Sequence, residues 1–282
     1  MNDSMHLFPD LPEGTCIIDT HCHLDMSDYV GDLDAVIERA RQKKVTEIIT
    51  IGIDLESSRK AISLARKYPG VRASVGIHPH DLPSDDDSTY VDIANLIGEN
   101  REYIAGYGEI GLDYAKMYRP LERQLHHFRI QLELARTLDL PVIIHDRDAH
   151  DDVLGILEQC GPFPAGGVMH CFSGDYAMAC RAIDLGFFLS IPGIVTYKNA
   201  DNLRVVARKI PITSLVLETD GPFLTPHPWR GKRNESAYIL ATAACIADLR
   251  NMPLADLARA TTANAIALFG PAPCHLEGTI RS

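Results

Sequence analysis

Histidine and acidic residues recur along this chain at the ends of short apolar, β-branched runs. Six of them have side chains that bind divalent cations well, namely His21, His23, Glu109, His145, His170 and Asp220. Four imidazoles and two carboxylates exceed the ligands of one tetrahedral zinc, so they predict two cations that share a carboxylate about 3.5–4 Å apart. Imidazole suits Zn²⁺, whereas carboxylate and water also suit Mn²⁺ or Mg²⁺. The chemistry that this set predicts is hydrolysis, because such cations lower the pKa of water.

A regular framework must bring these distant residues together, and the hydrophobic pattern predicts one. Short β-branched runs alternate with amphipathic segments, and the predicted strands cover residues 16–23, 47–53, 72–78, 103–113, 142–147, 166–172, 187–193 and 214–220. Helical periodicity follows each run, as in residues 32–44, 121–138 and 254–270. This alternation predicts a parallel sheet, and eight strands favour a closed barrel. We therefore expect the α/β class and a single-domain (β/α)8 TIM-type barrel.

The domain boundaries follow from where the alternation begins and ends. We expect an N-terminal extension over residues 1–14, the hydrolase barrel over 15–270 and a C-terminal tail over 271–282. No G-x-G-x-x-G sequence follows the first predicted strand, which argues against a dinucleotide-binding fold.

The candidate ligands all fall where such a barrel has its active site, at the carboxyl ends of the strands. Asp19, His21 and His23 are spaced two apart, so we expect all three to point to one face. Taken singly, a buried histidine is more often a hydrogen-bonded core residue, and an acidic residue after a strand often caps the next helix. The prediction depends on six such residues meeting at one rim, where they would be costly to bury without cations.

Composition limits the partners and the compartment. The net charge of −11, from 27 basic and 38 acidic residues, argues against a broad DNA-coating surface, which usually carries a basic excess. The seven cysteines include no C-x-x-C pair, which favours reduced thiols in the cytoplasm. No apolar stretch approaches the roughly 18 residues of a membrane span. We expect a cytoplasmic protein with no membrane contact and no obligate protein partner.

Seven motifs, in order along nearly the whole chain, resemble those of the TatD family of metal-dependent DNases. They are DTHCHLD (19–25), GIHPH (76–80), GEIGLDY (108–114), PVIIHDRDA (141–149), MHCFSG (169–174), LETDGPFL (217–224) and RGKRNES (230–236). The resemblance implies an amidohydrolase-like barrel with two divalent metal ions (Mg, Mn or Zn) that hydrolyses phosphodiester bonds in DNA. Two positions depart from the family pattern: Asp148 stands where glutamate is usual, and Ser236 where proline is usual.

The resemblance also implies roles for the ligands. His21 and His23 hold one ion, His145 and His170 hold the other, and Glu109 bridges them. Asp220 ligates the first ion near the attacking water, so Asp220 and Glu109 are the expected catalytic residues.

Further residues are candidates for contact with the substrate, which we expect to be DNA, preferably single-stranded ends trimmed by 3′–5′ exonuclease action. These are His78, His80, Arg147, Lys198 and Arg230, with Lys232 and Arg233 beside them. For the basic residues, solvated loop charge is an equal alternative. Glu218 faces the same way as Asp220, so it could hold an additional metal or orient a ligand.

Three other functions stay open at the level of sequence. A C–N or lactone hydrolase is one, although many such barrels bridge their metals with a lysine on the fourth strand, where this chain has Glu109. A hydrolase of aminoacyl-tRNA esters is the second. A non-catalytic, metal-binding scaffold is the third, and the presence of every catalytic residue type argues against it.

Overall fold

The computed structural model describes residues 10–83 and 88–271, which form a single eight-stranded α/β barrel. The parallel strands follow one another in chain order: β1 (Ile17–Cys22), β2 (Val45–Ile51), β3 (Val71–Val75), β4 (Ile104–Asp113), β5 (Val142–Arg147), β6 (Gly167–Met169), β7 (Phe187–Ile191) and β8 (Leu215–Leu217). The predicted fold class is confirmed.

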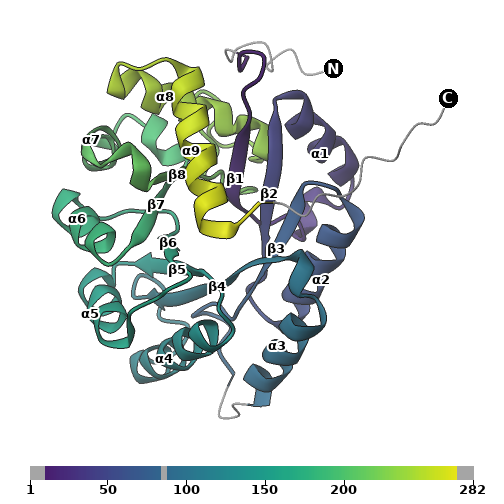
Figure 1. Cartoon of the computed structure of the whole chain (residues 1–282), viewed down its shortest axis with the longest axis vertical. Coiled ribbons are helices and arrows are strands. Elements are labelled where there is room, and N and C mark those ends of the chain that lie inside the picture. Colours follow the sequence, from purple (N-terminus) through teal and green to yellow (C-terminus); the bar gives the residue numbers. More distant parts are fainter. Residues whose placement is uncertain (1–9, 84–87, 272–282) are drawn as a thin grey trace.

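Helices surround the strands in chain order, from α1 round to α8 (Figure 1). They are α1 (Leu33–Gln42), α2 (Leu55–Lys67), α3 (Ser88–Glu99), α4 (Leu121–Thr137), α5 (His150–Cys160), α6 (Tyr176–Asp184), α7 (Asp201–Lys209), α8 (Ile239–Arg250) and α9 (Leu254–Phe269). Short 3-10 helices are η2 (Ser27–Tyr29), η3 (Arg101–Tyr103), η4 (Gly193–Thr196), η5 (Ile212–Ser214) and η6 (Ser236–Tyr238).

Two helices, α2 and α6, begin where the sequence supplies a side-chain cap for their free N–H groups. The Asp54 carboxylate accepts a hydrogen bond from Ser57 N at 2.7 Å, and the Ser57 hydroxyl accepts one from Asp54 N. Asp175 caps α6 in the same way through Met178 N. Such caps stabilise a helix by about 1 kcal/mol each. They fix the points at which the chain leaves the carboxyl ends of β2 and β6.

The interior of the barrel is filled with apolar side chains and closed at its amino end by the last helix. Inward-facing aliphatic residues, including Ile18, Ile49 and Val216, form one cluster with Leu268 and Phe269 of α9. In Figure 1, α9 accordingly lies over the strands rather than in the outer ring of helices. Because one end is apolar and plugged, the polar residues are left to the other end.

Direct hydrogen bonds between β1 and the segment after β8 join the two ends of the sheet. Asp220 N donates to His21 O at 2.9 Å, and His23 N donates to Gly221 O at 2.7 Å. Cys22 and Gly221 form a parallel bridge at the same level. The barrel therefore closes beside the predicted metal ligands, at its carboxyl end.

Six strands (β1, β2, β3, β6, β7 and β8) end earlier than predicted, so some candidate residues lie just beyond a strand instead of on it. β6 ends at Met169 and β8 at Leu217, which places His170 and Asp220 in the following loops, and β3 ends before His78. Cys171 and Asp220 have positive φ angles of 46° and 54°, a conformation that no strand continues. The sequence pattern did not reveal these turns because neither residue is a glycine, the residue type that usually marks a positive φ.

The predicted terminal segments are only partly covered. Residues 1–9 and 272–282 lie outside the described residues, and of the rest Leu11 is buried in the core. Within the described ranges, no helix is long and apolar enough to cross a membrane. The six cysteines there are all free thiols.

A buried ion pair holds the end of α9 against the barrel. Arg72 on β3 pairs with Glu47 on β2 at 2.6 Å and donates to the carbonyl groups of Phe269 (2.8 Å) and Gly270 (2.9 Å). Arg72→Met should lower the free energy of unfolding by about 3–5 kcal/mol, because it leaves a buried carboxylate without its cation. Urea unfolding followed by circular dichroism measures this.

The matched control also removes the charge of Glu47, which has no cation partner in Arg72→Met. Arg72→Met combined with Glu47→Gln should recover part of the lost stability, since no buried charge is left without a partner. A single variant as stable as the wild type would contradict this account of how α9 is held.

Candidate metal centre

A cavity of about 550 Å³ opens at the carboxyl ends of the strands. Its polar lining includes His23, His78, His80, Glu109, Asp113, His145, His170 and Asp220. Its apolar lining comes from Met26, Ile53, Ile194, Phe223 and Leu224. The volume is in the range of pockets that bind small ligands, and the polar groups gather on one part of its wall.

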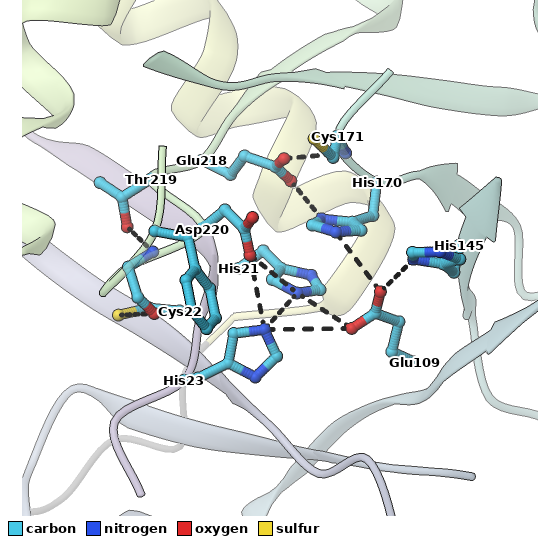
Figure 2. A network of polar contacts seen from close by, with 12 residues as sticks. His21, Cys22, His23, Glu109, His145, His170, Cys171, Glu218, Thr219 and Asp220 are labelled. Atoms are coloured by element: carbon cyan, nitrogen blue, oxygen red, sulfur yellow. Dashed lines mark hydrogen bonds and ion pairs between the residues drawn. The ribbon is translucent and has the colours of Figure 1, made fainter. Parts of the chain in front are cut away.

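Glu109 lies at the centre of this polar group, and its two oxygens face different histidines (Figure 2). Oε2 lies 3.4 Å from His21 Nε2 and 4.0 Å from His23 Nε2. Oε1 lies 2.7 Å from His145 Nδ1 and 3.4 Å from His170 Nε2. The two oxygens of one carboxylate thus face two pairs of imidazoles, which is the arrangement expected of a ligand that bridges two cations.

An irregularity in β4 directs Glu109 to this place. The pairing of β4 with β5 shifts register between Tyr107 and Ile110, and Glu109 lies inside the shift. Gly108 has φ +150°, and a Cβ there would lie 2.5 Å from Ile143 O, so only glycine allows the two strands to approach so closely. Bulges of this kind often re-aim a side chain next to a site.

The first group of candidate ligands consists of His21, His23 and Asp220. The Nε2 atoms of the two histidines are 3.3 Å apart, and Asp220 Oδ1 lies 3.4 Å from His23 Nε2 and 3.8 Å from His21 Nε2. The hydrogen bonds that close the barrel fix the backbone of all three. The positive φ of Asp220, 54°, is a strained conformation of the kind that clusters at functional sites.

Asp19 does not join the two histidines, although we expected all three on one face. Its carboxylate accepts hydrogen bonds from Thr219 N at 2.9 Å and from the Thr219 hydroxyl at 2.6 Å. The register of β1 against β2 shifts between Asp19 and Cys22, so simple alternation does not hold there. Burial raises the pKa of Asp19 to about 6 despite these bonds. Asp19 thus positions the segment that carries Asp220.

The second group contains His145 and His170, each held by a further carboxylate. His145 Nε2 lies 3.2 Å from Asp113 Oδ2, on the side of the ring opposite Glu109. His170 Nδ1 lies 3.0 Å from Glu218 Oε2, and Glu218 Oε1 accepts a hydrogen bond from Cys171 N (Figure 2). A carboxylate behind a ligating histidine fixes the tautomer and the orientation of its ring. For Glu218 this contact favours orientation of a ligand over an additional metal.

Burial and neighbouring charges set the protonation of this cluster. Burial lowers the pKa of His21 to about 3, and the nearby His170 adds to the effect. Burial also lowers the pKa of His145 and His170, but Asp113, Glu109 and Glu218 outweigh it and raise these values to about 9 and about 10. Burial raises the pKa of Glu109, yet the adjacent histidines hold it well below its usual value. The buried carboxylates therefore require positive charge at this place.

The donor set fits divalent cations. His21, His23 and Asp220 bring ligand atoms within 4.8 Å of one another, and so do His78, Glu109 and His145. The Nδ1 atoms of His21 and His23 are buried and have no hydrogen-bond partner among the described residues. Their Nε2 atoms converge instead on the carboxylates of Glu109 and Asp220. A cation bound there would be coordinated by the imidazole nitrogens and would balance the negative charge of the carboxylates.

Comparison with known proteins decides the family. A family model described as TatD related DNase matches residues 18–270. The chain belongs to the TatD family. It is similar to YabD of Bacillus subtilis, a metal-dependent hydrolase by name, with 41% identity over 253 residues that cover 90% of this chain and 98% of YabD. Its identity to YcfH of Escherichia coli is 37%, over 90% of this chain and 95% of YcfH.

Solved structures agree with the TatD assignment. The crystal structure of YjjV, a TatD homologue from Escherichia coli, superposes with a TM-score of 0.86 at 34% identity, over 90% of this chain and 98% of YjjV. A TatD-family hydrolase from Entamoeba histolytica, at 23% identity and a TM-score of 0.83 over 91% of this chain and 99% of that chain, shares the fold.

The residues predicted to touch substrate are placed in different surroundings. His78, His80 and Arg147 line the cavity, and His78 Nε2 lies only 3.7 Å from Glu109 Oε1, within the cluster itself. Lys198 is exposed and Arg230 lies over the Tyr197 ring at 4.5 Å, and neither is part of the cavity lining.

The two remaining basic candidates lie beyond β8. Both terminal nitrogens of Arg233 pair with the Asp32 carboxylate at 2.7 Å, which gives this side chain a structural partner. Lys232 is exposed.

Sequence reasoning missed other residues of the site. Asp113 stands four residues after Glu109 on the same strand, so even spacing was an available signal for it. Lys116 also lines the cavity, but it lies in a loop, where periodicity gives no information.

The contacts behind His170 yield a prediction about cation affinity. Glu218→Gln replaces one carboxylate oxygen by an NH₂ group, which then faces either His170 or Cys171 N. His170 should therefore lose its fixed orientation. We expect cation affinity to fall about 10- to 100-fold, the usual effect of such changes. Isothermal titration with Zn²⁺ or Mn²⁺ measures it, and Glu158→Gln on the outer surface is the control. Unchanged affinity in Glu218→Gln would show that His170 needs no such partner.

Proposed function

We propose that this chain, a metal-dependent hydrolase of the TatD family, cleaves phosphodiester bonds in DNA with two divalent cations, Mg²⁺, Mn²⁺ or Zn²⁺. The proposal includes 3′–5′ exonuclease action on single-stranded ends, in the cytoplasm. The observation that supports it best is the position of Glu109, with one oxygen toward each pair of histidines. Two-metal hydrolytic sites need such a shared ligand.

The residues divide into two ion sites in this proposal. His21, His23 and Asp220 would hold the first ion, His145 and His170 the second, and Glu109 both. When bound, two such cations lower the pKa of water and neutralise charge on the phosphodiester.

Individual side chains also have proposed roles toward the attacking water and the phosphate. Asp220 is the proposed general base, because its carboxylate lines the cavity beside His23 and can accept the proton that the attacking water loses. Arg147 and Lys116 line the same cavity and would bind the phosphate oxygens that do not react. His80, held by Asp113 at 2.9 Å, is a further donor toward the substrate.

Charge and size favour a strand end as the substrate. With a net charge of −11, the chain lacks the basic excess that coats a duplex, so anion binding must come from a compact site. A cavity of about 550 Å³ is typical of small-ligand pockets and admits a splayed nucleotide more readily than a double helix. Polarity of digestion is part of the proposal and is tested with end labels.

Other hydrolase activities are outcomes of the same test. A lactonase related to phosphotriesterases from Deinococcus radiodurans shares the fold with a TM-score of 0.57 at 17% identity, over 93% of this chain and 98% of that chain, so this likeness carries no substrate with it. The assay panel therefore includes lactones, amides and an aminoacyl-tRNA ester beside DNA and RNA. Hydrolysis of one of these in place of DNA would replace the proposal.

Removal of the cations is the most direct test. Chelation should abolish hydrolysis of 3′- and 5′-labelled oligonucleotides, and added Mg²⁺, Mn²⁺ or Zn²⁺ should restore it, with single strands shortened from the 3′ end. With pKa values of about 9 for His145 and about 10 for His170, protons compete with the cations. Apparent cation affinity should therefore rise with pH until these two groups lose their protons, near pH 9 to 10. Full activity of chelated protein would refute the proposal.

Variants of the two central acids test their roles. Asp220→Asn should reduce turnover by about 10²- to 10⁴-fold, as expected for the loss of a general base, with little change in the circular dichroism spectrum. Glu109→Gln should be more severe and should also reduce cation binding, because it weakens both ion sites. Steady-state kinetics at saturating metal measure both effects. Near wild-type turnover in either variant would rule out the role assigned to that residue.

A further inference from the structure

Two exposed aromatic side chains lie beside histidines of the cavity lining. Phe223, which follows β8, is 48% exposed, and Tyr118, which follows β4, is 60% exposed. Neither is needed to hold a cation, and neither was singled out from the sequence. Single exposed apolar residues are common on protein surfaces, so the surroundings of these two decide whether they have a role.

Phe223 is a rigid part of the cavity wall. Its ring lies 6.0 Å from the ring of His23, edge to face, and it lines the cavity. Its backbone is fixed on both sides, because Phe223 N donates to Asp220 O at 2.9 Å and Phe223 O accepts from Asn234 Nδ2 at 2.6 Å. The ring is therefore held beside the first ion site while nearly half of it stays open to solvent.

Tyr118 does not itself line the cavity, but it lies beside His80, which does. Its ring lies 4.7 Å from the ring of His80, edge to face. His80 in turn shares the Asp113 carboxylate with His145, at 2.9 Å and 3.2 Å. Tyr118 N donates to Lys116 O at 2.7 Å, so the same loop brings a cavity-lining cation and the exposed ring together.

Exposed aromatic rings beside a site that binds phosphate suit one kind of ligand. Nucleobases stack on such rings with about 1–3 kcal/mol per base, whatever their identity. Paired bases in a duplex are already stacked and cannot turn toward the protein without cost. A ring beside His23 and a ring beside His80 would therefore bind bases next to the bond to be cleaved, and only in an unpaired strand.

We propose that Phe223 and Tyr118 are stacking platforms for the nucleobases that flank the bond to be cleaved, and that they determine the preference for single strands. This inference rests on the proposed function. The rings touch bases and not the reacting atoms, so they contribute to substrate binding, and their loss should be felt in KM and Kd more than in kcat.

The experiment is a cycle that removes the ring and the base separately. Binding of a single-stranded oligonucleotide is measured by fluorescence anisotropy with metal-loaded protein in the Asp220→Asn background, which slows cleavage. Phe223→Ala and Tyr118→Ala should each weaken binding by about 5- to 150-fold, the equivalent of 1–3 kcal/mol. An abasic site at the matching nucleotide should weaken binding to the unaltered rings equally. Combining the two changes should cost no more than either alone.

Control variants separate stacking from other effects. Phe223→Tyr keeps an aromatic face and should bind normally, and so should Tyr176→Ala, which removes a 39% exposed aromatic residue of α6 whose ring lies against Lys209. In wild-type protein the two platform variants should raise KM for single strands and leave kcat within about threefold, so the preference over duplex should shrink.

Two failures are distinguishable. If the wild-type protein cleaves DNA, but alanine at both platforms leaves oligonucleotide binding unchanged or the abasic and alanine effects simply add, the stacking inference is overturned and the proposed function stands. If the metal-loaded wild-type protein neither binds nor cleaves any DNA, the proposed function fails and takes the inference with it.

Discussion

Glu109 is only 3% exposed, and the surrounding side chains must offset the free-energy cost of burying its carboxylate. An ionised carboxylate without partners in a protein interior costs several kcal/mol. Here imidazoles from β1, from β5 and from the end of β6 surround it, and the carboxylates of Asp113, Glu218 and Asp220 hold those imidazoles in turn. The candidate ligands lie on or just after β1, β4, β5, β6 and β8, so the cluster exists only when the sheet is closed.

The hydrogen bonds that close the barrel also bring the cluster together. The hydrogen bonds that join β1 to the segment after β8 involve the backbone of His21, His23 and Asp220. At the opposite end, α9 fills the barrel with apolar side chains, and Arg72 secures its last turn. The apolar core thus supplies the rigidity that the polar end requires, because close-packed side chains tolerate little displacement.

The same arrangement is compatible with an acidic protein that acts on the anionic substrate of the proposed function. A net charge of −11 repels nucleic acid from most of the surface, whereas bound cations are the largest local charges in a site and attract phosphate within a short range. In the proposed function, binding then depends on contacts close to the ions, from Arg147, Lys116 and the rings of Phe223 and Tyr118. Such a site favours a substrate that can enter the cavity over one that lies along the surface.

The sequence by itself determined the α/β barrel and the residue types of the cluster. Strand and helix periodicity are local properties, and His21, Glu109, His145 and Asp220 are marked by where they fall on that pattern. Only the tertiary structure decided which oxygen of Glu109 faces which histidine, that Asp19 turns to Thr219, and that Glu218 supports His170.

The physical reason lies in distance along the chain and in broken alternation. Asp19 and Thr219 are 200 residues apart, and their contact depends on how the sheet closes. The register shifts in β1 and β4 and the positive φ of Asp220 redirect side chains in ways that a two-residue repeat does not predict. Loops follow no repeat at all, so the positions of Lys116, Tyr118 and Phe223 beside the cluster came only from the folded chain.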